Sequence, residues 1–113
     1  MARVGNCTTP EDARALVCHY IGNCLLGIAG LYERLEYEHD QEQRGRIEDS
    51  IGRQEMELVG ALDILAYRMG SLEHTEMAER IDELLEVVLE SGTTESHART
   101  AIHNKYMELF EAV

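Results

Sequence analysis

Cations, aromatic residues and proline are scarce in this sequence. The chain has 10 Lys and Arg against 22 Asp and Glu, which gives a formal net charge of -12. Binding to a phosphate backbone needs clustered cations, so direct nucleic-acid contact is not expected. With one Pro, one Phe and no Trp, the core must be aliphatic. A β-sandwich or barrel usually needs more turn residues and more β-branched runs than this sequence has. The acidic surface either keeps a small protein soluble or meets a basic partner.

The sequence predicts neither a membrane-spanning segment nor the disulfides of an oxidising compartment. We find no run of about 18 uncharged apolar residues that would span a membrane, and residues 1–6 lack the apolar stretch of a secretory signal. Cys7, Cys18 and Cys24 are an odd number without a disulfide spacing, which is typical of reduced thiols. We therefore expect a cytoplasmic protein that does not contact a membrane.

Apolar residues recur at helical spacing through most of the chain. They form 44% of the 113 residues, which is enough for one core. Thr9 and Pro10 are typical of a helix start, and the first helix is expected to run to about Glu38. The polar residues 39–43 predict a turn. Three more helices are expected, at about Arg44 to Met69, at about Leu72 to Ser91, and from Thr93–Glu95 to the end.

This pattern predicts an all-α fold in a single domain, residues 1–113. Short connections favour antiparallel neighbours, so residues 10–70 are expected to form a helical hairpin. Residues 71–113 are expected to form a shorter C-terminal helical pair. The expected core positions are Val17, Ile21, Leu25, Ile28, Leu31, Tyr32, Leu35, Ile47, Ile51, Leu58, Leu62, Leu65, Met69, Met77, Ile81, Leu84, Leu85, Val88, Leu89, Ala98, Ile102, Tyr106, Leu109 and Phe110.

One face of the first helix carries a histidine among small residues. His19 is two residues from both Val17 and Ile21, so it points about 200° away from each of these core positions. Glycine disfavours a helix by about 1 kcal/mol relative to alanine, so the glycines here indicate close approach of a partner protein or of a neighbouring helix. The residues of this predicted partner-binding face are Asp12, Ala15, Gly22, Leu26, Gly27 and Gly30.

The segment around this histidine resembles a known motif. The matching positions are His19, Ile21, Asn23, Leu25, Ile28 and Gly30. In this order and spacing they resemble the H-box of histidine kinases. Residues 40–44 resemble the turn that follows in that domain, and residues 46–68 resemble its second helix. The resemblance covers about residues 10 to 70 and is to the dimerisation and histidine-phosphotransfer domain.

The resemblance implies a hairpin that pairs with a second copy into a four-helix bundle. It implies that His19 is the phosphoacceptor and that Asn23 positions the water that hydrolyses an aspartyl phosphate. An imidazole nitrogen is a competent nucleophile, and an amide both donates to and accepts from water. The partner would be the receiver domain of a response regulator or a separate kinase. Mg²⁺ would belong to the receiver, so this chain would bind no cofactor and no metal.

The sequence departs from the family in ways that affect the chemistry. Tyr20 stands where an acid usually follows the histidine, and a phenol is a poor base at neutral pH. Cys24 stands where the family has Pro. The residues after Gly70 contain no Gly-rich nucleotide lid, so autokinase activity is not expected. The activity would be that of a histidine phosphotransferase or a receiver phosphatase, and whether either remains is left open.

Two other interpretations stay open. The four helices could close into one monomeric bundle, as in stand-alone histidine phosphotransfer domains, although the lysine that those domains usually keep is missing. The chain could also be a non-catalytic acidic binder that inhibits a kinase, a receiver or a nucleic-acid enzyme. The third expected helix supplies the acids for such a contact, namely Glu73, Glu76, Glu79, Asp82, Glu83, Glu86 and Glu90.

Overall fold

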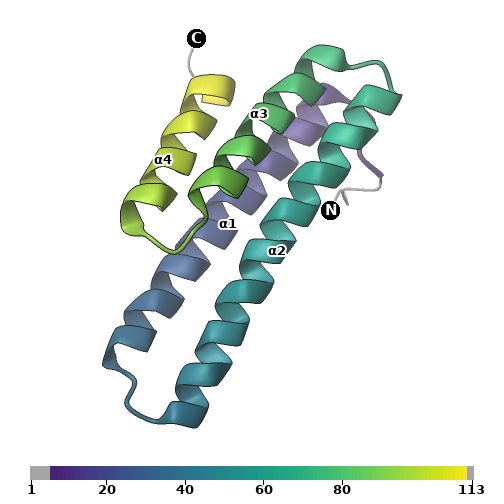
Figure 1. Ribbon diagram of the computed structural model, residues 1–113. Coiled ribbons are helices and arrows are strands. Elements are labelled where there is room, and N and C mark those ends of the chain that lie inside the picture. Colours follow the sequence, from purple (N-terminus) through teal and green to yellow (C-terminus); the bar gives the residue numbers. More distant parts are fainter. Residues whose placement is uncertain (1–5, 112–113) are drawn as a thin grey trace.

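The computed structural model describes residues 6–111, which form helices joined by short turns. The elements are α1 (Pro10–Tyr37), α2 (Gln41–Ser71), α3 (Thr75–Ser91), α4 (Ser96–Tyr106) and a π-helical turn, η2 (Met107–Glu111). Residues 6–111 contain no strand, which confirms the all-α prediction. Helix α2 packs antiparallel to both α1 and α3 (Figure 1).

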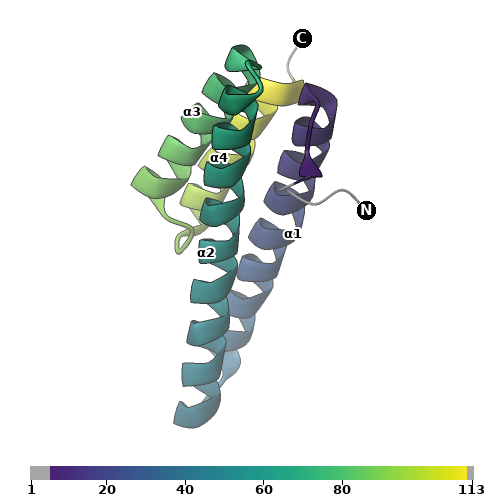
Figure 2. The same ribbon diagram turned by 90° about the vertical axis from the view of Figure 1, so that its right-hand side faces the viewer.

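The two long helices determine the shape of the molecule. Helices α1 and α2 have 28 and 31 residues, whereas α3 and α4 have 17 and 11. The shorter pair therefore covers only one half of the α1–α2 hairpin, and the other half projects as two helices alone (Figures 1 and 2). The molecule measures 50 × 27 × 22 Å as a result.

The turn between α1 and α2 is shorter than the sequence analysis predicted. The expected helix start near Arg44 was wrong, because α2 already begins at Gln41. A carboxylate oxygen of Asp40 accepts a hydrogen bond from the backbone N–H of Glu42 and caps the helix there. The Arg44 guanidinium donates to the carbonyls of Leu35 and Glu38, which closes the end of α1.

A Schellman motif ends α2. The backbone N–H of His74 donates to the Met69 carbonyl and that of Glu73 donates to the Gly70 carbonyl. Glu73 has a positive φ of 65°, the left-handed conformation that this motif requires. The expected start of the third helix near Leu72 was therefore wrong by one turn, since α3 begins at Thr75.

The turn between α3 and α4 is anchored to the hairpin. Gly92 ends α3 with φ 68° and ψ -169°, a conformation that is essentially restricted to glycine. Thr93, which follows, is fully buried and donates a hydrogen bond to a carboxylate oxygen of Glu55 on α2. Arg99 donates to the carbonyls of Thr93 and Thr94, and its guanidinium lies 5.4 Å from the centre of the Tyr32 ring on α1.

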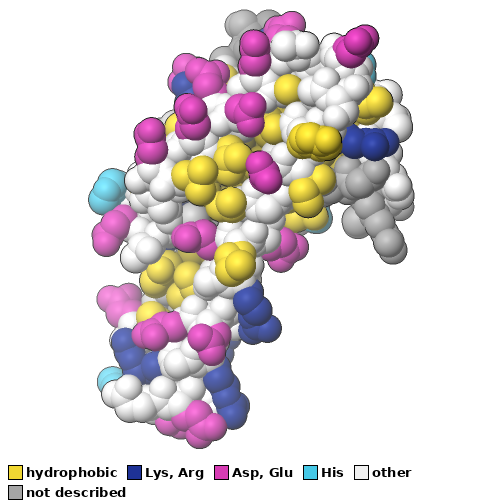
Figure 3. All heavy atoms as spheres, turned by 45° about the vertical axis from the view of Figure 1, so that its right-hand side comes forward, with side chains coloured by type: hydrophobic (Ala, Val, Ile, Leu, Met, Phe, Trp, Pro, Cys, Tyr) yellow, Lys and Arg dark blue, Asp and Glu magenta, His cyan; other side chains and the backbone are white. Residues whose placement is uncertain are grey.

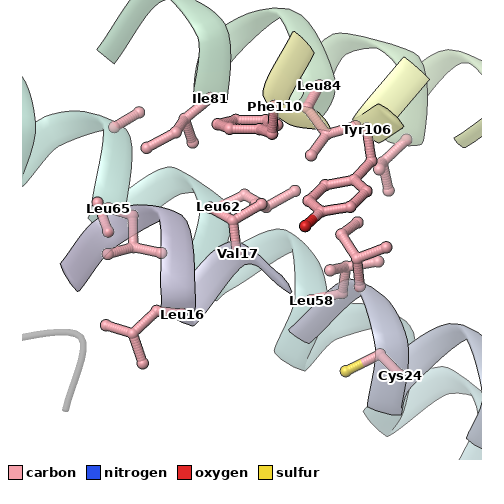
Figure 4. Packing of buried hydrophobic residues seen from close by; sticks show 14 of the residues in the cluster. Leu16, Val17, Cys24, Leu58, Leu62, Leu65, Ile81, Leu84, Tyr106 and Phe110 are labelled. Atoms are coloured by element: carbon pink, nitrogen blue, oxygen red, sulfur yellow. The ribbon is translucent and has the colours of Figure 1, made fainter. Parts of the chain in front are cut away.

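The main core lies where all four helices meet. Side chains from α1, α2, α3 and α4 converge there, and the stacked rings of Tyr106 and Phe110 close it at 5.5 Å between centroids (Figure 4). Most of the expected core positions are buried. Leu89 is a wrong prediction, because its side chain is 62% exposed. Within residues 6–111, eight buried residues were not among the expected core positions, namely Cys7, Ala13, Leu16, Cys24, Ala61, Ala66, Ala78 and Thr93.

A second, smaller cluster lies in the projecting half of the hairpin. It joins Ile28 to Ile47 and Ile51, and the half-buried Leu31, Tyr32 and Leu35 pack against it. In the other half, α3 and α4 cover the apolar faces of the hairpin within one chain. Val17 and Ile21, two of the expected core positions, are therefore buried there within one chain.

Helix α1 is more apolar than we expected from the sequence. By length and composition alone it could cross a membrane, and 33% of its most apolar window is buried inside the molecule. The expectation that the chain has no run of about 18 uncharged residues apolar enough to span a membrane was wrong, because residues 15–32 contain no Asp, Glu, Lys or Arg. Helices that form the core of soluble proteins pass the same test, and α1 contributes Val17, Ile21 and Leu25 to the core.

Candidate functional site

His19 and Asn23 form an exposed pair on α1. One helical turn separates them, so both side chains lie on the same face. The amide nitrogen of Asn23 lies 2.9 Å from Nδ1 and 3.3 Å from Nε2 of His19. The Tyr20 ring stands edge-on to the imidazole at 5.5 Å between centroids. The pair predicted from the sequence is therefore brought together, with solvent access to the ring.

The roles of the two ring nitrogens in this contact depend on the tautomer of His19 and on the orientation of the Asn23 amide. When the Asn23 amide donates to Nδ1, that nitrogen must be unprotonated, and the proton of the neutral ring is on Nε2. When the amide is turned over, its oxygen accepts from a protonated Nδ1, and the lone pair of the neutral ring is then on Nε2. Only the turned-over amide favours the tautomer in which Nε2 carries the lone pair.

The cysteines near this face differ in their surroundings. Cys18 is exposed, whereas Cys7 and Cys24 are buried, and all three are free thiols. Burial, followed by the nearby carboxylate of Glu57, raises the pKa of the Cys24 thiol to about 11. Burial and then the charge of Asp12 raise the pKa of Cys7. A raised pKa keeps a thiol protonated and unreactive at neutral pH.

The predicted partner-binding residues do not all share one environment. Ala15, Gly22, Leu26 and Gly30 are exposed on α1, as expected. Asp12 is half-buried in the first turn of the helix, where its backbone N–H donates to the Thr9 hydroxyl. This contact makes Asp12 part of the helix cap.

Gly27 faces a neighbouring helix instead of solvent. A Cβ atom added at this position would collide with the side-chain amide of Gln54 on α2. At Gly22 and Gly30 nothing lies within 4 Å of such an atom. Gly27 therefore faces the Gln54 side chain of α2, whereas Gly22 and Gly30 leave the helix surface open.

A groove runs along α1 beside this face. It has a volume of about 390 Å³ and lies between α1 and α4. Its lining residues are Ile21, Gly22, Leu25, Leu26, Ala29, Ser96, Arg99, Thr100 and His103. Gly22 and Leu26 were predicted from the sequence as partner-binding residues, whereas none of the α4 residues of the groove was. The signal that could have found them is the absence of Asp and Glu from residues 96–106.

The acids of α3 form a separate surface. Glu76, Glu79, Asp82, Glu83, Glu86 and Glu90 are all exposed. Two of these acids form ion pairs. A guanidinium nitrogen of Arg80 lies 2.6 Å from a carboxylate oxygen of Glu76, and Nζ of Lys105 lies 3.8 Å from a carboxylate oxygen of Glu83. In Figure 3 acidic side chains occur over both halves of the molecule, and Lys and Arg side chains stand among them on the projecting half.

Among the described residues, no three His, Cys, Asp or Glu side chains come together to hold a metal ion. No family model, curated protein or solved structure matches this chain. The interpretation of the site therefore depends on the geometry of its own residues.

Proposed function

We propose that the chain is a two-component-type histidine phosphotransfer or response-regulator-binding protein, with His19 as its phosphoacceptor. The observation that carries the proposal is the contact of 2.9 Å between the amide of Asn23 and Nδ1 of the exposed His19. An exposed imidazole has the access that a nucleophile needs, and the neighbouring amide of Asn23, turned so that its oxygen faces a protonated Nδ1, would leave the lone pair on Nε2. The H-box resemblance assigns these same two residues.

The chemistry follows from the ring and its amide neighbour. With the Asn23 amide turned over, so that its oxygen accepts from a protonated Nδ1, the Nε2 lone pair attacks the phosphorus of an aspartyl phosphate on the partner. The N–P bond forms as the P–O bond breaks, and the aspartate leaves as a carboxylate. The Nδ1 proton stays on the ring throughout. The reverse reaction returns the phosphoryl group to the aspartate of a receiver domain.

The arrangement supports phosphoryl transfer more than autophosphorylation. Tyr20 stands edge-on beside the imidazole and supplies no carboxylate base. The phosphoryl group would therefore come from a receiver or from a separate kinase, in the cytoplasm. Because α3 and α4 cover the hairpin in one half, a single chain suffices for the four-helix section. A homodimer would then pair through the projecting half, where the second hydrophobic cluster lies.

Phosphoramidate, a small donor that phosphorylates reactive histidines, tests the proposal without a known partner. We expect intact-mass analysis to show an acid-labile gain of one phosphoryl group in the wild-type chain and in His97→Gln. His97 is an exposed histidine of α4 and provides a matched control. His19→Gln should show no gain. Equal labelling of His19→Gln and the wild type would overturn the proposal.

The exposed acids of α3 favour a second candidate function, a non-catalytic binder of a basic groove. Such a complex would depend on charge and would weaken steeply as salt rises. It would also be indifferent to His19→Gln. These two properties separate it from the phosphotransfer proposal.

A further inference from the structure

Acidic residues are missing from two segments that lie side by side. The chain has 22 Asp and Glu, yet none occurs in residues 13–32 or in residues 96–106. The first segment is most of α1, and the second is the whole of α4. The groove between α1 and α4 is lined only by these two segments. Among the described residues, no acidic side chain therefore lines this groove, although the molecule as a whole is strongly acidic.

The α1 side of the groove is apolar. Buried Ile21 and Leu25 form its floor, and the Leu26 side chain on its rim is 75% exposed. Gly22 is also open to solvent, with nothing within 4 Å of an added Cβ atom. A large exposed leucine beside an open glycine offers apolar surface that a partner can bury.

The α4 side of the groove is lined by hydrogen-bond donors and by a positive charge. Ser96 and Thr100 contribute hydroxyls and His103 an imidazole, all of them exposed. The Arg99 guanidinium is fixed by the carbonyls of Thr93 and Thr94 and by the ring of Tyr32. The N-terminus of α4 lies at Ser96, so the positive end of its dipole adds to this wall.

We propose that this groove binds an acidic amphipathic helix of a partner protein. A groove between two neighbouring helices fits a third helix, whose apolar face would cover Leu25 and Leu26. Its carboxylates would face Arg99 and His103 on α4. Charge selects an acidic occupant, because Arg99 and His103 line the groove and no Asp or Glu of the described residues does. The inference does not depend on phosphoryl chemistry at His19.

A peptide with the sequence of residues 75–91 is a suitable probe, because it is itself an acidic amphipathic helix. The fluorescent peptide and a scrambled version would be titrated with the full-length chain, and binding followed by anisotropy. Leu26→Glu and His103→Glu place a carboxylate in the groove. Met56→Glu is the matched control, since Met56 on α2 is also 75% exposed and lies outside the groove. Circular dichroism would verify that each variant is folded.

We expect the peptide to bind the wild type and Met56→Glu with equal affinity. Leu26→Glu and His103→Glu should each weaken binding by about tenfold or more, and added salt should weaken it further. Binding that Leu26→Glu leaves unchanged, or that the scrambled peptide reproduces, overturns the proposal. A dimer of the chain alone that Leu26→Glu dissociates would also overturn it, because the occupant would then be a second copy.

Discussion

The hydroxyl of Thr93 donates a hydrogen bond to a carboxylate oxygen of Glu55, and this contact joins the α3–α4 turn to α2. Thr93 is fully buried, although it lies in a turn. The next residues start α4, so the contact helps to determine where α4 lies against α1. The groove beside His19 therefore depends on a polar anchor at the end of α3.

Replacing Thr93 with valine removes this hydrogen bond but keeps the shape of the side chain. We expect a loss of about 1–2 kcal/mol in the free energy of unfolding, because the Glu55 carboxylate loses a donor in a partly buried place. Urea unfolding followed by circular dichroism measures this loss. Thr94→Val is the control, since Thr94 is exposed. An equal effect of both variants would contradict the anchoring role.

Substitution by alanine should change the free energy of unfolding in opposite directions at Gly92 and at Gly52. Gly92 has φ 68°, so Gly92→Ala should lower the free energy of unfolding by about 1–3 kcal/mol. Gly52 lies exposed in the interior of α2 with open space around an added Cβ atom. Gly52→Ala should therefore raise stability by about 0.5–1 kcal/mol. Destabilisation by both substitutions would argue against the two backbone conformations described.

Glycine at position 73 should stabilise the chain. Glu73 has a positive φ of 65° at the end of α2, where glycine is free of the steric strain of a Cβ atom. We expect Glu73→Gly to raise the free energy of unfolding by about 0.5–1 kcal/mol. The midpoint of urea unfolding reports the change. A lower midpoint would show that the Glu73 side chain matters more than its backbone strain.

The three cysteines should react at different rates. Cys18 is exposed, whereas Cys7 and Cys24 are buried. The pKa of Cys24 is raised to about 11, so its thiol stays protonated as the pH rises from about 7 to about 9. Iodoacetamide should therefore modify Cys18 first and the other two only after unfolding. Peptide mapping at successive times identifies each site, and early labelling of Cys24 would contradict its burial.

Much of the fold could be predicted from the sequence because the helices are strongly periodic. The six expected core positions of α2, from Ile47 to Met69, are all buried. The starts of α2 and α3 were misplaced because their caps are local polar contacts. At α2 the cap uses the Asp40 carboxylate, and at the end of that helix a glutamate adopts a conformation more typical of glycine. Such contacts leave no periodic signal.

The candidate site was predictable only along one helix. His19 and Asn23 are one turn apart in a single helix, so spacing alone places them together. The α4 side of the groove was missed because it comes from a segment distant in sequence, and periodicity does not indicate which helices become neighbours. Gly27 was grouped with the exposed residues because spacing on one helix does not reveal that Gln54 of α2 lies against it.

The most direct test of the account maps the modified histidine after treatment with phosphoramidate. The chain has five histidines, of which His39, His97 and His103 are exposed like His19 and provide internal controls. Fragmentation that preserves the N–P bond should locate the phosphoryl group on His19 while the other histidines stay unmodified. Labelling of all the exposed histidines at similar rates, or none at His19, would contradict the claim that this residue is a phosphoacceptor.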